Sequence, residues 1–250
     1  MTIEQFKEFA PRIVSEDETR RALMYPCCNG CRAYASDGRI ALIIKTCYTS
    51  SFKTDDETGV RVVTTSLNDC INAFDAALER GNCEAFSIDA DRLRNAARAT
   101  FDDLEPSMDY LRSYEPDPDD LDDVASTESV RFVRERYSRV ILPNRGRSVI
   151  AGYYADILAD VLAATDTHCA YVRHYIKDSP IYAKGANWYL IVMPIRTDCG
   201  YGGEKRWMND SAIADAATGE LVHSYDPDGN GPDRADMDVL RFPKKGEVAG

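Results

Sequence analysis

Eight cysteines and three histidines are the side chains of this sequence with the most specific chemistry. Cys28 and Cys31 form a C-x-x-C, a spacing used by zinc knuckles and by thiol–disulfide exchange motifs. No second cysteine pair follows at a similar spacing, and the motif lies between two strand-like runs rather than at the start of a helix. Because Asn-Gly favours a tight turn, we interpret Cys28-Asn29-Gly30-Cys31 as a hairpin turn with reduced thiols.

Other catalytic chemistry has little support in the sequence. No serine or cysteine can be placed beside His168, His174 or His223, and no phosphate-binding glycine loop is present. One stretch, Asp226, Asp228 and Asn230 with a glycine at the sixth place, has the oxygen spacing of a calcium loop. Met237 stands where such a loop needs a bidentate glutamate, so we favour a plain Asp/Gly turn. We therefore expect no catalytic residue, no cofactor and no metal.

Charge and hydropathy limit the partners of the chain. Forty-two acidic residues against thirty basic ones give a net charge of −12, the wrong sign for coating nucleic acid with the whole surface. The longest apolar run, 188–195, has the length of a strand and not of a membrane span. The acidic, amphipathic N-terminus does not resemble a signal peptide, so we expect a cytoplasmic protein without a membrane partner.

Hydrophobic periodicity and turn signals predict the elements that would position any site. In the first hundred residues they predict helices at 3–14, 67–80 and 91–99 and strands at 21–28, 31–36, 39–46, 60–65 and 86–88. Asn29-Gly30 and Asp37-Gly38 are the expected turns between the first three strands.

The second half begins with a change in composition. Prolines and clustered acids predict an exposed loop over 102–128. Beyond it we predict a helix at 153–164 and strands at 130–133, 137–142, 169–175, 181–183, 188–195 and 220–225.

One helix followed by three antiparallel strands thus occurs twice, over 3–46 and over 153–195. This pattern indicates an α+β fold built of repeated modules. We expect Leu158, Val161 and Leu162 to pack inward onto the 188–195 strand. The corresponding division of the chain has four parts: residues 1–101, an acidic insertion at 102–130, a half-domain at 131–196 and a C-terminal extension at 197–250.

Three stretches then suggest a family. Residues 33–41 (Ala-Tyr-Ala-Ser-Asp-Gly-Arg-Ile-Ala) resemble the A-T-D-G-H-R-L-A stretch of bacterial DNA polymerase III β sliding clamps, without the histidine. Residues 137–143 resemble that family's Y-R-R-V-L-P, and residues 189–196 resemble its closing V-M-P-M-R strand. The resemblance covers about residues 3–48 and 131–196, and it implies a DNA-clamp-like fold in which the helix-plus-three-strand modules pair into domains.

The resemblance also implies a function and a site. Clamps of this family are not enzymes: they form rings around duplex DNA and hold polymerases and repair proteins through a short peptide in an apolar pocket. Carried over by motif, the pocket would be formed by Ser36, Gly38, Arg39, Ile40, Met193, Pro194, Ile195 and Arg196. The alternative is that residues 193–195 are simply the end of a buried strand.

The sequence departs from the family where DNA would pass. The 153–164 helix carries Asp156 and Asp160 where a pore helix needs basic residues. Only the 91–99 helix offers a basic face, with Arg92, Arg94 and Arg98, so we expect weak, salt-sensitive DNA binding through these three residues. The 54 residues after Arg196 also extend beyond the point where the family ends.

Two classes of function remain open. The first is a non-enzymatic, clamp-like accessory of DNA replication, encoded by a phage or mobile element, that binds a polymerase or other replication protein through a peptide and forms a homo-oligomer. The second is a metal-dependent or hydrolytic enzyme that uses the carboxylates of the C-terminal extension.

Overall fold

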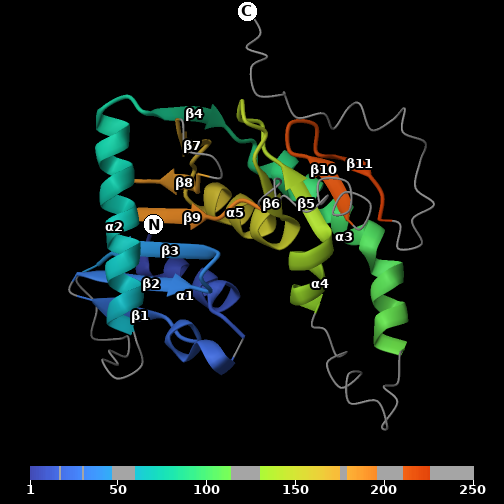
Figure 1. Cartoon of the computed structure of the whole chain (residues 1–250), viewed down its shortest axis with the longest axis horizontal. Helices are drawn as coiled ribbons and strands as arrows, with labels where there is room; N and C mark the ends of the chain where they lie inside the picture. The colour runs from blue at the N-terminus through green and yellow to red at the C-terminus, as the bar shows by residue number, and fades with distance from the viewer. Residues whose placement is uncertain are drawn as a thin grey trace, which may run out of the picture. The chain divides into compact units, whose positions relative to one another are not determined.

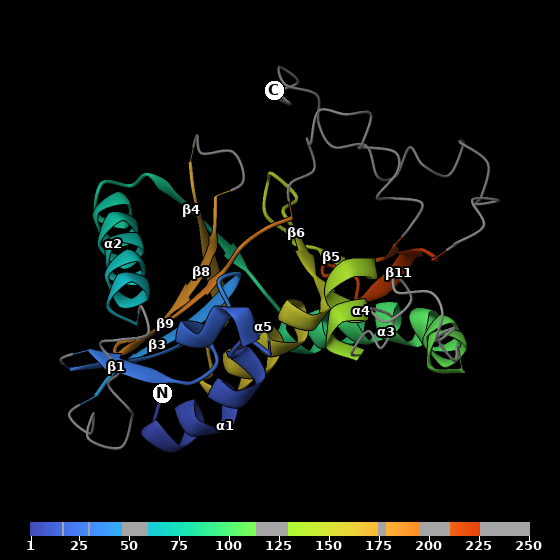
Figure 2. The same cartoon turned by 60° about the horizontal axis from the view of Figure 1, so that its bottom comes forward.

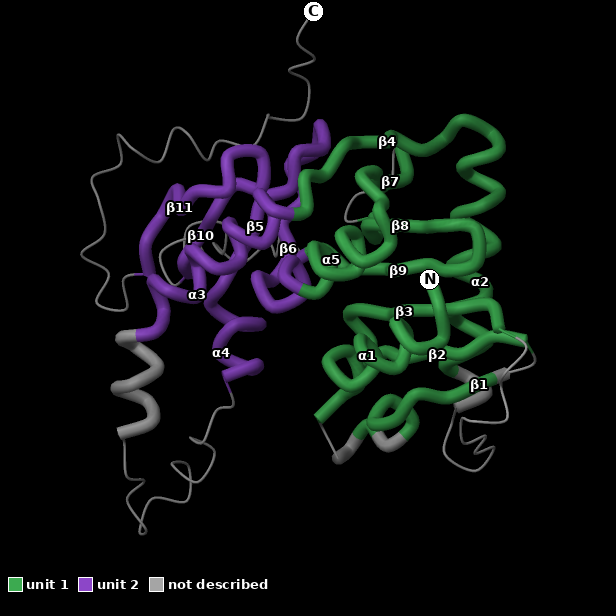
Figure 3. Tube along the Cα trace, turned by 180° about the vertical axis from the view of Figure 1, so that it is seen from behind, with its two compact units in different colours: residues 1–90, 157–194 green, residues 91–156, 195–250 purple. Residues whose placement is uncertain are grey.

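The computed structural model describes residues 1–16, 18–29, 31–46, 60–113, 130–174, 179–195 and 211–225 (Figure 1). Two compact units share the chain (Figure 3). Unit 1 contains residues 1–90 and 157–194, and unit 2 contains residues 91–156 and 195–250. Each unit therefore combines two separate stretches of the chain. The described helices and strands give a mixed α+β fold.

Unit 1 is built on a seven-stranded sheet in which every strand pair is antiparallel. Its order is β1 (Cys27–Asn29), β2 (Arg32–Ser36), β3 (Ile40–Lys45), β9 (Trp188–Val192), β8 (Ile181–Lys184), β7 (Cys169–Arg173) and β4 (Cys83–Ser87). Two three-strand meanders, β1-β2-β3 and β7-β8-β9, meet where β3 pairs with β9. Ile40 lies opposite Val192 in that pair, and Ile43 lies opposite Tyr189.

Helices cover both faces of this sheet (Figure 2). Helix α1 (Ile3–Ile13) packs on β2 and β3, on the same face as α5 (Gly152–Ala164). An ion pair of 2.7 Å between Arg12 and Asp160 joins these two helices. Helix α2 (Val60–Glu79) lies on the other face, and a short 3-10 helix, η1 (Glu18–Leu23), follows α1.

Burial follows from this layering, because strands covered on both faces need apolar side chains throughout. Strand β9 is buried at every position, and Leu158, Val161 and Leu162 of α5 are fully buried, as their spacing predicts. On the α2 face, the core contains Ile71 and Phe74 together with tyrosines of the sheet. The ring of Phe74 stacks on Tyr182 with centroids 4.2 Å apart.

Unit 2 has a four-stranded sheet in the order β11 (Glu220–His223), β10 (Ala212–Asp215), β5 (Ser138–Ile141) and β6 (Val149–Ala151). The β5–β10 pair is parallel and the other two pairs are antiparallel. Helices α3 (Ala90–Ser113) and α4 (Val130–Tyr137) accompany the sheet. A hydrogen bond of 2.6 Å between the hydroxyls of Thr100 and Ser138 links α3 to β5.

Three predictions of the element type are wrong. Residues 60–65 begin helix α2 instead of forming a strand, and residues 130–133 belong to helix α4. Both stretches are rich in β-branched and aromatic residues, whose strand preference the tertiary context overrides. The loop predicted over 102–128 is helical as far as Ser113, because the apolar spacing of α3 continues to the fully buried Leu104.

Boundaries and two strands also differ. The strand predicted over 21–28 is reduced to β1, since residues 18–23 form η1. Strands β6 (Val149–Ala151) and β10 (Ala212–Asp215) lie at places where the sequence predicts no strand. The Asp37-Gly38 turn is confirmed: Gly38 has φ +92°, a conformation that favours glycine. Of the Asn29-Gly30 turn, Gly30 lies outside the described residues, and Asn29 pairs with Arg32 as a hairpin requires.

Candidate partner-peptide and DNA-binding sites

The turn between β2 and β3 is held by its own polar side chains. Asp37 is buried, and its Oδ1 accepts hydrogen bonds from the backbone N–H of Arg39 at 2.7 Å and of Ile40 at 2.8 Å. The Ser36 hydroxyl donates to the carbonyl of Ile40 at 2.8 Å and accepts from the N–H of Gly38 at 3.0 Å. The Ser-Asp-Gly sequence therefore fixes the backbone of the turn.

The structure brings this turn and the end of β9 together. The N–H of Met193 donates to the carbonyl of Arg39 at 2.8 Å, continuing the β3–β9 ladder one residue beyond Val192. The two segments matched to the clamp pocket are therefore hydrogen-bonded neighbours within unit 1.

The eight residues predicted for the pocket differ in exposure. Gly38, Arg39 and Met193 are exposed, with 41% of Met193 open to solvent, and Pro194 is half-buried. Ser36 and Ile40 are buried, so they would act only by shaping the turn. Ile195 donates its N–H to the carbonyl of Val149 in unit 2, and Arg196 lies outside the described residues. The role of these residues as a pocket remains a prediction.

Two residues beside the turn were not identified from the sequence. The Arg20 guanidinium of η1 donates to the carbonyl of Asp37 at 3.1 Å. Leu23 lies so close that a Cβ on Gly38 would be 3.6 Å from its Cδ1. Arg20 precedes the strand predicted over 21–28 and Leu23 lies within it, whereas both belong to the 3-10 helix η1 in the structure.

A polar contact on the other face of the unit 1 sheet connects α2 to the strands. Asp75 accepts hydrogen bonds from Lys184 Nζ at 2.8 Å and from the Tyr189 hydroxyl at 2.6 Å. Partial burial raises the pKa of Asp75, but the two hydrogen bonds and the lysine charges outweigh it, and the net pKa is lowered. Burial and the neighbouring carboxylate raise the pKa of Tyr189 to about 12. Asp75 therefore stays ionised and Tyr189 stays neutral at ordinary pH, as expected for a contact that stabilises the packing of α2 on the sheet.

The C-x-x-C motif lacks the setting of a reactive thiol. Cys28 is buried on β1, and burial raises the pKa of its thiol. Reactive cysteines have lowered pKa values, because the thiolate is the nucleophile. Burial likewise raises the pKa of Cys27 to about 11, and this residue belongs to the core beside Ile71 and Phe74. The geometry is consistent with a hairpin turn.

The three arginines predicted to bind DNA lie on α3 of unit 2, and two of them have protein partners. Arg92 donates to the carbonyl of Ala217 at 2.8 Å, in the turn between β10 and β11. Arg94 forms an ion pair of 2.8 Å with Asp91. Arg98 is exposed. The helix also carries acids at 102, 103 and 105, so its charge is close to balanced.

A stronger basic feature follows on the chain and was not identified from the sequence. Residues 131–147 contain six arginines and no lysine, against the single acid Glu135. They are Arg131, Arg134, Arg136, Arg139, Arg145 and Arg147. A count of charge in short windows would have found this segment, since it contrasts with the net charge of −12 for the whole chain.

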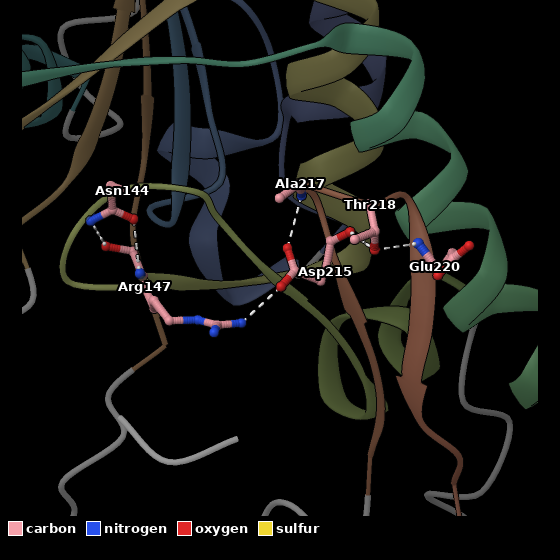
Figure 4. Close-up of polar contacts among 7 residues, drawn as sticks. Asn144, Arg147, Asp215, Ala217, Thr218 and Glu220 are labelled. Atoms are coloured by element: carbon pink, nitrogen blue, oxygen red, sulfur yellow. Dashed lines mark hydrogen bonds and ion pairs between the residues drawn. The ribbon is translucent and has the colours of Figure 1, made fainter. Parts of the chain in front are cut away.

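The last of these arginines lies in a loop that is stabilised internally (Figure 4). Asn144 accepts from the N–H of Ser148 at 2.9 Å and donates to its hydroxyl at 3.1 Å, which closes the loop between β5 and β6. Arg147 forms an ion pair of 2.8 Å with Asp215, whose other oxygen accepts from the N–H of Ala217. These bonds hold the β5–β6 loop against the β10–β11 turn.

Metal chemistry receives no support from the part of the chain that the structure describes. Among these residues no three histidine, cysteine or carboxylate side chains gather as metal ligands would. The weak calcium-loop candidates Asp226, Asp228 and Asn230 lie outside the described residues, as does the rest of the extension beyond Tyr225. No described helix has the length and hydrophobicity needed to cross a membrane.

Comparisons with protein-family models, with curated proteins and with solved structures found nothing that matches this chain. Function must therefore be argued from the geometry of the two units.

Proposed function

We propose that this chain is a non-enzymatic, clamp-like accessory of DNA replication that holds a partner protein through a short peptide beside the Ser36–Ile40 turn. The observation that carries the proposal is the hydrogen bond of 2.8 Å between Met193 and Arg39. It joins the two segments that resemble the two sides of the clamp pocket, although they lie about 150 residues apart in sequence.

The arrangement of unit 1 supports the clamp-like part of the proposal. Helix α1 with β1-β2-β3 and helix α5 with β7-β8-β9 are two modules of one helix and three antiparallel strands. They share a continuous sheet through β3–β9, and their helices lie on one face, joined by Arg12 and Asp160. Paired modules of this kind are what the resemblance implies for one domain of a clamp.

The chemistry of the exposed residues supports peptide docking. Met193 offers a flexible, polarisable apolar surface that adapts to different side chains. Arg39, exposed beside it, can pair with a carboxylate of the bound peptide. Because the backbone of the turn is fixed by Asp37 and Ser36, little conformational entropy is lost when a peptide binds.

The same helices argue against tight DNA binding by this face. Helix α5 carries Asp156 and Asp160 and no basic residue, and Arg12 of α1 is paired with Asp160. Phosphate contacts need an excess of cationic groups, so we propose that any affinity of α1 and α5 for duplex DNA is weak.

The test is a peptide-binding titration. Fluorescein-labelled decapeptides with a central Leu-Phe pair and flanking aspartates are titrated with the full chain, and binding is followed by fluorescence anisotropy. Met193→Asp is expected to weaken binding by about 5- to 30-fold, the effect of losing 1–2 kcal/mol at an interface anchor. Because Met193 is 41% exposed, the fold should survive the change.

Val222→Asp is the matched control, since Val222 is an exposed apolar residue of unit 2. It should leave peptide binding unchanged. Equal losses in both variants, or no saturable binding by the wild-type chain, would refute peptide docking at this surface. Sedimentation equilibrium tests ring closure separately: a closed ring requires an oligomer, and a monomer would refute it.

A further inference from the structure

We propose that helix α4 of unit 2 is a contact site for single-stranded nucleic acid, in which Phe132 stacks on a base and Arg136 binds the adjacent phosphate. The inference goes beyond peptide docking by unit 1 and would stand if that role failed. It also assigns the nucleic-acid contact to α4 and not to the arginines of α3.

The first argument is the local charge. Six arginines against one glutamate over 131–147 give unit 2 a basic segment in a chain of net charge −12. Such a chain repels nucleic acid on average, so binding must use a local excess of positive charge. All six cations are arginine, whose planar, weakly hydrated guanidinium binds phosphate with two parallel hydrogen bonds.

The second argument is the exposed side of α4. Phe132 is 43% exposed and Val130, two residues before it, is 38% exposed, so this side of α4 presents an apolar surface beside its arginines. Arg136, one helical turn after Phe132, is also exposed, and its guanidinium lies 5.8 Å from the Phe132 ring and 5.3 Å from the Tyr137 ring. An aromatic ring beside an arginine is the combination that single-strand-binding proteins use for a base and its phosphate.

The third argument is that α4 is rigidly held from beneath. Arg134 lies over the Phe101 ring at 4.7 Å, and Arg131 lies over the Tyr153 ring at 4.9 Å. Arg139 donates to the carbonyls of Glu135 and Ser138, both at 2.8 Å, and so caps the end of the helix. These guanidinium groups fix the orientation of α4. Arg131 pairs with Glu135 at 2.7 Å and Arg134 lies 3.9 Å from Asp156, so both charges are offset and the proposed phosphate contact is assigned to Arg136.

Single strands fit this surface better than duplex DNA or a protein. In a duplex the bases are stacked on one another and present no face to Phe132, whereas unpaired bases do. A protein partner would be drawn by the apolar residues Val130 and Phe132 but would have no general need for the clustered arginines. An anionic ligand with aromatic faces uses both features.

The experiment measures the binding of the full chain to fluorescein-labelled oligothymidylate of about 16 nucleotides, a length that one binding module can cover. An oligonucleotide of equal length without bases and a duplex of equal length are the comparison probes. Phe132→Ala is expected to weaken binding to oligothymidylate by about 5-fold or more, the lower end of the effect of losing one stacked base. It should leave the affinity for the base-free strand unchanged.

Arg136→Gln is expected to weaken both single strands and to reduce the salt slope of log Kobs by about 0.7, the value for one phosphate contact on a single strand. Val222→Ala, an exposed apolar residue elsewhere in unit 2, is the control and should change nothing. The double charge reversal Arg94→Glu/Arg98→Glu tests α3 in the same assay.

Several results would overturn the assignment. One is wild-type binding that is not saturable on any probe, and another is an affinity of Phe132→Ala for oligothymidylate within twofold of the wild type. A third is a loss in the α3 double variant that exceeds the loss in Arg136→Gln, which would return the contact to α3. Finally, Phe132→Ala could bind every oligonucleotide as tightly as the wild type and yet lose binding to a protein partner. That result would make α4 a protein-docking helix.

Discussion

The contact between Tyr189 and Asp75 allows a prediction in which a difference in stability at neutral pH disappears as the pH rises to 11. The Tyr189 hydroxyl donates to Asp75 at 2.6 Å, and the tyrosine is only 5% exposed. Replacing Tyr189 with Phe removes the hydroxyl and leaves the ring that packs beside Ile191 in the core. At neutral pH the variant should be less stable than the wild type.

The magnitude at neutral pH follows from the kind of bond. A hydrogen bond to a charged acceptor contributes about 1.5–3 kcal/mol. The Asp75 side chain is 33% exposed and keeps its bond to Lys184, so water and the lysine can compensate in part. We therefore expect Tyr189→Phe to lower the free energy of unfolding by about 1.5 kcal/mol at pH 7.

The dependence on pH follows from the raised pKa of Tyr189, which is about 12 in the folded chain against 10.0 for an unperturbed tyrosine. A raised pKa gives stability that is complete below pH 10 and is lost as the pH rises toward 12. About 1.4 kcal/mol of this contribution is lost at pH 11, out of about 2.7 kcal/mol in all. Phenylalanine cannot ionise, so wild type and variant should be about equally stable near pH 11.

The assay is urea unfolding in reducing buffer at pH 7, 9, 10 and 11, followed by tryptophan fluorescence. Other groups titrate in both chains, and their effects cancel in the difference. Tyr25→Phe is the control, since it removes a phenol that is 66% exposed and should change stability by less than about 0.5 kcal/mol at pH 7. A difference between Tyr189→Phe and wild type that stays constant from pH 9 to pH 11 would refute the reasoning.

Two further predictions concern the packing around the sites, and both are measured by urea unfolding at pH 7. Gly152→Ala places a Cβ against the buried Ser138 hydroxyl and should lower the free energy of unfolding by about 1–3 kcal/mol. The double variant Gly152→Ala/Ser138→Ala should recover part of this loss. Wild-type stability of the single variant would contradict the prediction. Asp37→Ala removes the acceptor of two backbone N–H groups and should cost about 2–4 kcal/mol, whereas Asp37→Asn retains one oxygen and should cost about half as much. Equal stability of the two Asp37 variants would show that the carboxylate does not hold the turn.

Elements with strong local signals could be predicted from the sequence. Helix α5 and strands β7, β8 and β9 are found close to their predicted ranges, because long apolar runs and helical spacing are local properties. The Asp37-Gly38 turn was predicted for the same reason, since only a residue that tolerates positive φ fits at Gly38.

The error at α2 arises from strand propensity, which led to the prediction of a strand at 60–65 and a separate helix at 67–80 where the structure has one helix. Val60 to Thr65 were separated from the following helix because valine and threonine favour strands. The spacing of Thr64, Leu67, Ile71, Phe74 and Leu78 is three or four residues throughout, and it indicates one helix. Thr64 and Ile71 are fully buried in the structure, and this burial outweighs the strand preference of the valines and threonines.

The error at α4 has a different origin. The stretch Val130-Arg131-Phe132-Val133 alternates like a strand, but Arg131 and Glu135 are four residues apart and form an ion pair of 2.7 Å in the helix. The strand prediction for 130–133 also hid the basic character of residues 131–147. On a strand these arginines would be divided between two faces, whereas on a helix Arg131 and Arg134 lie about one turn apart. The predicted DNA contact lies on α3 because 91–99 is the one predicted helix with a basic face.

The position of the candidate peptide site could not be derived from spacing at all. Ser36–Ile40 and Met193 lie about 150 residues apart in sequence, and no local pattern states that β3 pairs with β9. The family resemblance supplied the expectation that the two segments meet. The backbone gives a physical reason, because the meanders β1-β2-β3 and β7-β8-β9 each have an apolar strand, β3 or β9, with an unpaired edge. Pairing β3 with β9 satisfies the backbone hydrogen-bonding groups of both edges. The turn before β3 and the residue after β9 are then adjacent whatever their side chains are. Peptide docking at this surface must therefore depend on the exposed side chains of Met193 and Arg39, and the titration with Met193→Asp tests that dependence directly.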